Sequence, residues 1–366
     1  MNYSDLSLEE KISQMIILGI NEENVTDRLK KMIKEYKIGG IILFKKNYKN
    51  YEELVNLINE LKEANKENKV PLFISLDQEG GRVNRMPSEF ENIKSPAELI
   101  KTKTSENIID AAKITSEMLK KCGINMVFSP VLDIQRFVDE HAIGDRCYGK
   151  TEEEVSKYGV QVMRELKNNN LISVIKHFPG HGATNIDSHF ILPTINKNIE
   201  ELEKTDMKPF EKAIQEGAEA IMVGHLLIKG VNNYLPVSLS KKIITTYLRK
   251  KYKFKGLIIT DDLKMKAIHF MYGSNLAFKK AFEAGNDIIL TGLKETEVID
   301  AIENIKKLVE RNKIKEARIN RSIKRILYAK ISHNINDNVV QKITKEEINN
   351  INSRIFELNK KVLINN

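Results

Sequence analysis

The stretch KHFPGHGATNIDSH, residues 176–189, gathers five titratable side chains in one short segment. His177 and His181 have the HxxxH spacing of a metal pair, but that spacing needs a helix to bring both rings onto one face. Pro179 and Gly180 break such a helix, so we expect no metal site. Two other interpretations stay open: Lys176 as a Schiff-base lysine, and histidines that bond to the backbone of a Gly/Pro loop.

Asp187 and His189 offer a further interpretation, a mobile loop that carries a general acid/base. The two residues are separated by the small Ser188, and side chains at i and i+2 lie on the same side of an extended segment. A carboxylate beside an imidazole fixes its tautomer and raises its pKa, so the ring can hold a proton near pH 7. The residues GHGATN just upstream give such a loop its flexibility.

A general acid needs a partner, and Asp261 is the candidate. Retaining glycoside hydrolysis, for example, pairs a general acid with a carboxylate nucleophile on the other side of the bond. Asp261 closes the apolar run GLIIT, and Asp262 should point away from it because successive strand residues alternate faces. The alternative role for Asp261 is a helix N-cap before LKMKAI. We expect Asp262 to cap the helix and Asp261 to face a pocket.

The elements that must position these side chains are short apolar runs, which alternate with longer amphipathic stretches as βα units of a parallel sheet do. Eight runs are candidate strands: QMIILGI (14–20), GGIILF (39–44), LFISLD (72–77), NMVFSPVLD (125–133), ISVIKH (172–177), AIMVGH (220–225), GLIITD (256–261) and DIILTG (287–292). The first could instead continue the helix begun by LSLEEKI. Five runs end in polar residues, at Asp77, Asp133, Lys176 with His177, His225 and Asp261. Because strand ends of a (β/α)8 barrel share one active-site face, these residues predict one polar pocket.

The predicted fold class is therefore α/β, a single (β/α)8 barrel over residues 1–332. Helical stretches separate most of the runs, among them NYEELVNLINELKEAN, SENIIDAAKITSEMLKKCG, TEEEVSKYGVQVMRELKNN and SLSKKIITTYLRKKY. An open doubly wound sheet is the alternative, but no GxGxxG loop follows an early strand. Residues 333–366 contain the amphipathic KEEINNINSRIFELNKKVL, too short for a domain, and we expect this tail to dock on the barrel exterior.

Composition narrows the setting of the chain. Of its 366 residues, 30% are charged, and no apolar stretch approaches the roughly 18 residues of a membrane span. The N-terminus lacks the basic start and apolar block of a signal peptide. Cys122 and Cys147 lack metal spacing and indicate free thiols in a reducing compartment. The net charge of +9 comes from lysines interspersed with glutamates, which favours solvated helix faces over nucleic-acid binding. We expect a cytoplasmic monomer with neither nucleic-acid nor membrane partners.

Several motifs in order resemble glycoside hydrolase family 3, specifically its bacterial β-N-acetylglucosaminidases of cell-wall recycling. They are DQEGGRVNR, FSPVLDI, GDRCYG, KHFPGHG followed by DSH, and TDDLKM. The resemblance covers nearly the whole chain, and the histidine-bearing loop is its most specific part. Cys147 and Tyr148 depart from the more usual Ser-Phe or Ser-Tyr, and no second C-terminal domain is present in the sequence.

The resemblance implies a role for each of eight positions. Asp261 would be the nucleophile, His189 the acid/base and Asp187 its partner. The sugar ligands would be Asp77, Arg85, Arg146, Lys176 and His177. The implied reaction is retaining removal of terminal β-linked N-acetylglucosamine from wall fragments, small carbohydrate substrates, without metal or organic cofactor. Phosphorolysis, a broader β-glucosidase activity, a catalytically silent sugar-binding protein and a Schiff-base aldolase remain the alternatives.

Overall fold

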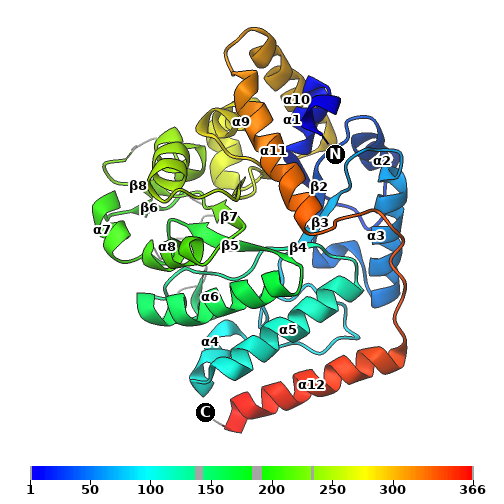
Figure 1. The fold of residues 1–366 in the computed structure, drawn as a ribbon, viewed down its shortest axis with the longest axis vertical. Helices are drawn as coiled ribbons and strands as arrows, with labels where there is room; N and C mark the ends of the chain where they lie inside the picture. The colour runs from blue at the N-terminus through cyan, green and yellow to red at the C-terminus, as the bar shows by residue number, and fades with distance from the viewer. Residues whose placement is uncertain (1, 137–142, 184–191, 232–234, 365–366) are drawn as a thin grey trace.

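Eight parallel strands form the centre of the molecule, a (β/α)8 barrel (Figure 1). The computed structural model describes residues 2–136, 143–183, 192–231 and 235–364. Neighbouring strands follow the order β10-β1-β2-β3-β4-β5-β7-β9. The seam between β9 and β10 is short: a parallel bridge joins Ile259 to Ile288, and Thr260 N donates to Ile288 O at 3.1 Å.

Each predicted apolar run coincides with one barrel strand to within a few residues, so the predicted fold class is confirmed. The strands are β1 (Ile16–Gly19), β2 (Gly40–Leu43), β3 (Phe73–Leu76), β4 (Met126–Val127), β5 (Ile172–Phe178), β7 (Ala220–Val223), β9 (Leu257–Thr260) and β10 (Ile289–Thr291). Two more short strands, β6 (Thr194–Ile195) and β8 (Leu227–Ile228), pair with each other outside the barrel. The barrel strands are buried throughout, which explains their continuous apolar runs.

Helices surround the barrel and carry the chain from one strand to the next (Figure 1). They are α1 (Leu8–Gln14), α2 (Asp27–Lys34), α3 (Tyr51–Asn65), α4 (Pro96–Leu99), α5 (Ser105–Lys121), α6 (Glu152–Asn168), α7 (Ile199–Lys204), α8 (Lys208–Gln215), the π-helix η7 (Lys242–Lys251), α9 (Lys266–Ala284), α10 (Glu295–Glu310), α11 (Glu316–Ser332) and α12 (Lys345–Ile364). The four helical stretches expected from sequence correspond to α3, α5, α6 and η7.

The first strand, whose type the sequence left open, is separate from the helix before it. A capping box between Ser7 and Glu10 starts α1, which ends at Gln14. The chain then becomes extended, and β1 pairs in parallel with β10 on one side and β2 on the other. Pairing on both edges therefore overrides the helical pattern that LSLEEKI begins.

Lys330 on α11 joins the starts of three barrel strands. Its side chain is fully buried, and Nζ donates to Gln14 Oε1 at 2.9 Å, Gly39 O at 2.8 Å and Pro71 O at 2.7 Å. These acceptors precede β1, β2 and β3 respectively. Burial lowers the pKa of Lys330 to about 7. All three ammonium protons have partners, which compensates part of the cost of burying the group.

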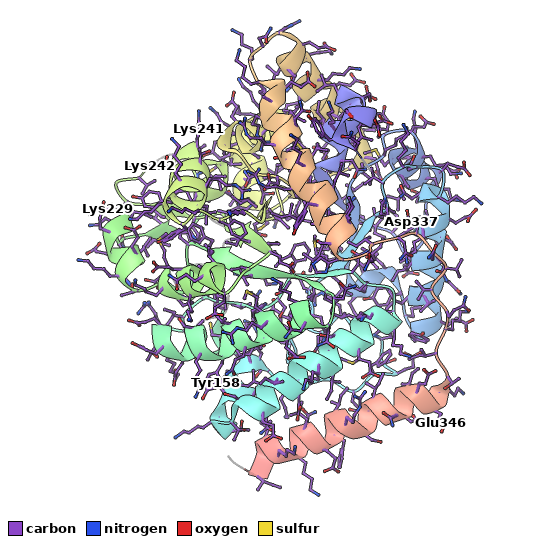
Figure 2. All side chains as sticks on the ribbon, in the orientation of Figure 1. Tyr158, Lys229, Lys241, Lys242, Asp337 and Glu346 are labelled. Carbon is purple, nitrogen blue, oxygen red and sulfur yellow. The ribbon has the colours of Figure 1, made fainter. Side chains whose placement is uncertain are left out.

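The C-terminal residues run across the barrel exterior and end in α12, which packs along α5 (Figures 1 and 2). On the way, Asp337 accepts from Leu72 N at 3.2 Å and from Asn65 Nδ2 at 2.7 Å. The Asn352 side chain donates to Glu89 O at 2.8 Å. The apolar side of α12 is buried through Ile348, Ile351, Ile355, Leu358 and Val362. These contacts hold the segment to the outer helices and to the residue that precedes β3.

The structure also bears on two smaller expectations, the state of the cysteines and the presence of membrane-spanning helices. Cys122 and Cys147 are both buried, and neither is part of a disulfide, as predicted. In the described part of the chain, no helix is both long and apolar enough to cross a membrane.

Candidate active site

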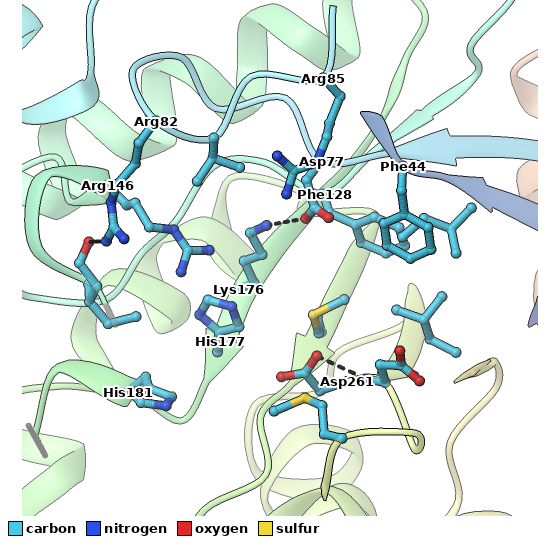
Figure 3. Close-up of a pocket in the computed structure, with 17 residues that line it drawn as sticks. Phe44, Asp77, Arg82, Arg85, Phe128, Arg146, Lys176, His177, His181 and Asp261 are labelled. Atoms are coloured by element: carbon cyan, nitrogen blue, oxygen red, sulfur yellow. Dashed lines mark hydrogen bonds and ion pairs between the residues drawn. The ribbon is translucent and has the colours of Figure 1, made fainter. Parts of the chain in front are cut away.

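A cavity of about 430 Å³ opens at the carboxyl ends of the barrel strands (Figure 3). We call it the barrel-mouth pocket. Its lining residues are Ile42, Phe44, Asp77, Arg82, Val83, Arg85, Phe128, Ile143, Arg146, Lys176, His177, His181, Met222, Asp261, Asp262, Met265 and Leu290. Six of the eight predicted site residues are among them, although they come from distant parts of the sequence. The predicted convergence of polar strand ends is thus observed for Asp77, Lys176, His177 and Asp261. Asp133 and His225 are completely buried and do not line the pocket, which corrects the prediction for these two strand ends.

Lys176 is the centre of an ion-pair network on one wall of this pocket. It lies in β5, and its side chain is only 2% exposed. Its Nζ lies 2.6 Å from Asp77 Oδ1 and 2.5 Å from Glu79 Oε1. Both carboxylates hold the buried Nζ by hydrogen bonds, so this nitrogen is not presented to the carbonyl carbon that a Schiff base requires. This arrangement argues against the aldolase alternative.

Glu79 is a member of this network that our reading of the sequence did not single out. Its side chain is 1% exposed and forms a two-pronged pair with Arg146, at 2.8 Å from Nε and 2.9 Å from Nη2. Burial alone would raise its pKa, but the charges of Arg146 and Lys176 hold the pKa of Glu79 well below its usual range. Glu79 therefore fixes Arg146 and Lys176, which line the pocket, although Glu79 itself does not line it. Its spacing of two from Asp77 was only a weak signal, because the loop after β3 holds several other polar residues.

Arg85 is presented to the pocket by a backbone that is held on both sides. Its N–H donates to Gln78 Oε1 at 2.8 Å, and its carbonyl accepts from the Tyr48 hydroxyl at 2.5 Å. The nearby Arg82 pairs with Asp145 at 2.7 Å and also lines the pocket, although the sequence did not identify it. The arginines give this rim of the pocket a positive character.

Asp133 organises the histidines that follow β5. It is completely buried, and it accepts from His177 N at 3.3 Å, from His177 Nδ1 at 2.7 Å and from His181 N at 2.7 Å. A carboxylate can only accept, so Nδ1 of His177 is the donor in this bond and the orientation of the ring is fixed. Burial, reinforced by His177, lowers the pKa of His181 to about 4, so this ring is neutral at pH 7.

The positions of His177 and His181 also bear on the HxxxH metal interpretation. His177 belongs to β5 and His181 begins the 3₁₀ turn η5 (His181–Ala183), so the two are not on one helix. Their ring centres lie 5.9 Å apart. Across the described residues, no group of three or more His, Cys, Asp or Glu side chains could hold a metal ion.

Asp261 comes directly after β9 and lines the pocket. Its N–H donates to Val223 O at 3.0 Å, which continues the ladder between β9 and β7 by one residue. Figure 3 shows its carboxylate on the opposite side of the cavity from Asp77 and Arg85. A sugar bound between these walls would have hydrogen-bonding groups on one side and a carboxylate on the other.

The expectation for Asp262 was wrong in part. The N-cap of α9 is Met265, and Asp262 instead accepts from Lys264 N and Gly292 N, both at 2.8 Å. The residues LKM form a turn before the helix, so the aspartate caps this turn and ties it to the end of β10. Its side chain also lines the pocket, where burial raises its pKa.

The predicted acid/base pair, Asp187 and His189, lies outside the described residues. The buried Asp206 joins the chain that follows this segment to the chain that precedes residues 137–142. Its carboxylate pairs with Arg136 Nε at 2.8 Å and with Lys197 Nζ at 2.7 Å. Arg136 precedes residues 137–142, and Lys197 follows residues 184–191. Asp206 therefore links the two stretches of chain from which these segments depart.

Comparisons with known proteins identify the family of this chain. Residues 7–329 match the glycosyl hydrolase family 3 N-terminal domain. A β-hexosaminidase of Neisseria gonorrhoeae is 33% identical over 282 residues, covering 75% of this chain and 77% of the relative. A β-hexosaminidase of Methylobacillus flagellatus is 29% identical over 80% of this chain and 84% of its own length. The structure of a family 3 β-N-acetylglucosaminidase from Paenibacillus sp. superposes with a TM-score of 0.91 at 33% identity, over 98% of this chain and 69% of that protein. The chain belongs to glycoside hydrolase family 3.

Proposed function

We propose that this family 3 glycoside hydrolase is a retaining exo-β-N-acetylglucosaminidase with Asp261 as its nucleophile. The observation that carries the proposal is the placement of Asp261 in a pocket whose other wall holds Asp77, Lys176 and Arg146. Charged hydrogen bonds to sugar hydroxyls are strong and directional, so that wall suits a terminal sugar. The similarity to β-hexosaminidases supports an N-acetylated hexosamine as that sugar.

In the first step, Asp261 attacks the anomeric carbon and the bond to the leaving oxygen breaks. His189, protonated and paired with Asp187, gives its proton to that oxygen, so the aglycone leaves as a neutral alcohol. The product is a glycosyl ester on Asp261. The network around Lys176 would hold the sugar ring so that its anomeric carbon faces the carboxylate, which reduces the entropy cost of the attack.

In the second step, water hydrolyses this ester. His189, now neutral, takes a proton from the water as its oxygen attacks the anomeric carbon, and Asp261 leaves as a carboxylate. Two displacements at one carbon give net retention. Asp262 also lines the pocket, but its Oδ1 accepts from the N–H groups of Lys264 and Gly292, which favours Asp261 as the nucleophile.

The aglycone we propose is a wall fragment, an (anhydro-)N-acetylmuramic acid with or without peptide. Such fragments carry carboxylates, and the rim of the pocket holds Arg82 and Arg85. Negative charges at the rim would repel an acidic aglycone, whereas these two arginines attract it. Action in the cytoplasm as a monomer stays a prediction from the sequence.

Release of 4-nitrophenol from its β-N-acetylglucosaminide, against the β-glucoside and with or without phosphate, tests the proposal. We expect turnover of the N-acetylated substrate alone, at a rate indifferent to phosphate. A preference for the glucoside would contradict the substrate assignment. Phosphate-dependent release of sugar 1-phosphate would replace hydrolysis by phosphorolysis, and an absence of turnover with either substrate would favour a sugar-binding protein.

A further inference from the structure

A second cavity, of about 720 Å³, lies between η7, the end of α9 and the start of α11. We call it the basic cavity, because among its lining residues cations far outnumber carboxylates. Its basic residues are Lys241, Arg249, Lys250, Lys280, Lys313, Lys315, Arg318, Arg321 and Arg325, with Glu283 the acidic one. Figure 2 labels Lys241 on this side of the molecule. A chain whose formal net charge is +9 thus concentrates nine cations around one hollow.

The basic cavity lies at the end of the barrel opposite the barrel-mouth pocket. Arg249 and Arg325 on its wall both pair with Asp287, which comes just before β10 and accepts from Ile258 N in β9 at 2.9 Å. These atoms mark the amino ends of the strands. Asp261 follows the carboxyl end of β9. The two cavities are therefore separate sites.

The carboxylate of Asp287 is already saturated by the protein. It is completely buried. One oxygen accepts from Ser322 Oγ at 2.6 Å and Arg325 Nη1 at 3.0 Å, and the other accepts from Ile258 N and Arg249 Nη2. One negative charge thus faces two arginines directly, and a third arginine, Arg318, stands nearby.

Arg318 has no carboxylate in direct contact among the described residues. Its guanidinium donates to Asn286 O and to Ser322 Oγ, and it lies over the Phe282 ring, 5.7 Å from the centroid. Its Nε is buried and has no hydrogen-bond partner in the described part of the chain. Burial lowers its pKa to about 10, and repulsion from Arg325 and Arg249 adds to this effect against the attraction of Asp287. Positive charge is therefore in excess at the floor of the cavity.

The rim adds further cations without balancing anions. Lys241, Lys250, Lys313, Lys315 and Arg321 are exposed, and none makes an ion pair with a described carboxylate. Elsewhere on the surface, lysines pair regularly with glutamates, as Lys212 does with Glu216 at 2.8 Å. Such crowding of like charges destabilises a fold unless an anion relieves it.

We propose that the basic cavity binds a small ligand that carries two or more phosphate groups, such as inorganic diphosphate or a nucleoside triphosphate. Guanidinium groups match phosphate oxygens with two parallel hydrogen bonds, and several of them here lie around one hollow. The volume is within the range of small-molecule sites, which is about 300–1,000 Å³. A concave site with arginines at its floor suits a compact anion better than the backbone of a nucleic acid, which binds along an extended basic surface.

Isothermal titration calorimetry with inorganic diphosphate, ATP and inorganic phosphate tests the proposal on the full chain, in salt of about 0.15 M so that diffuse attraction is screened. We expect diphosphate and ATP to bind with one site per chain, and more tightly than inorganic phosphate. Tighter binding of ATP than of diphosphate would identify a nucleotide as the source of the phosphates, and equal affinities would identify the inorganic anion.

The variant K313E/R321E reverses two rim charges at exposed positions, and we expect it to weaken diphosphate binding about 100-fold. The control K113E/K120E changes the net charge equally on the exposed side of α5 and should bind as the wild type does. Circular dichroism should show both variants folded. Binding that is absent in the wild type, retained by K313E/R321E or lost equally in the control would overturn the proposal, as would binding of RNA without binding of diphosphate.

Discussion

Replacing Glu79 by glutamine removes a negative charge from between two buried cations. The carboxylate makes three contacts, at 2.8 and 2.9 Å with Arg146 and at 2.5 Å with Lys176. An amide keeps one oxygen but places an NH₂ where the other oxygen was, so that at least one donor of Arg146 or Lys176 then faces another donor. Breaking a buried pair in this way costs about 3–5 kcal/mol of unfolding free energy. Arg146 lines the pocket and loses its fixed position in this variant, so we expect kcat/KM to fall about a hundredfold.

Urea unfolding and 4-nitrophenyl β-N-acetylglucosaminide turnover measure both effects. Glu216→Gln is the matched control, because Glu216 also lies between an arginine and a lysine, Arg164 at 2.6 Å and Lys212 at 2.8 Å, but at the surface. We expect little change in the control, since water screens exposed pairs. Equal unfolding curves for Glu79→Gln and Glu216→Gln would refute the reasoning.

The same substitution predicts a pH dependence. Because the pKa of Glu79 is depressed in the fold, its contribution to stability is complete above the ordinary value of 4.5 and is lost as pH falls toward the lower folded pKa. The difference between wild type and Glu79→Gln should thus be constant at neutral pH and shrink below about 4.5. A difference that persists unchanged in acid would contradict the charge-based explanation.

Three further predictions concern other parts of the account. Lys330→Met leaves three buried acceptors unpaired and should lower the free energy of unfolding by about 2–4 kcal/mol, as measured in urea. Because the pKa of Lys330 is depressed in the fold, wild-type stability should also rise with pH from about 7 to about 10.5. The variant should lack this rise. Asp206→Asn should slow hydrolysis of aryl substrates with poor leaving groups more than those with good ones, since only the former need the acid; equal slowing would rule out a role through the acid/base segment. Asp261→Asn should lower kcat on the order of 10⁴-fold, while Asp262→Asn keeps an acceptor oxygen for its two N–H donors and should retain most activity; the reverse order would exchange the two roles.

The barrel could be predicted from sequence because each strand is buried on both sides. A continuous apolar run such as GLIIT is then visible without knowledge of its neighbours, and Asp261 after it marks the strand end. The ambiguity at QMIILGI was real, because a short apolar run fits a helix or a strand until both of its edges are paired. Asp262 was misjudged because the turn LKM separates it from α9. The periodicity of apolar residues does not predict the geometry of a turn that follows a strand.

The site was predictable wherever an ionisable residue ends a strand, and less so where the chain turns afterwards. Glu79 and Arg82 lie in the loop after β3, where the sequence offers many polar residues and no rule to rank them. Only the fold shows that Glu79 is buried between Arg146 and Lys176. The basic cavity was equally hidden, because its lysines and arginines come from separate helices and the turn before α11, and each looks like an ordinary solvated residue there.

The identity of the nucleophile is the central claim, and covalent trapping tests it most directly. A 5-fluoro-N-acetylglucosaminyl fluoride slows both steps but has a good leaving group, so the glycosyl-enzyme should accumulate. Mass spectrometry of the intact chain should show one added glycosyl group, and the peptide that carries it should place it on Asp261. An adduct on another residue, or inactivation without any adduct, would contradict the double-displacement mechanism on Asp261.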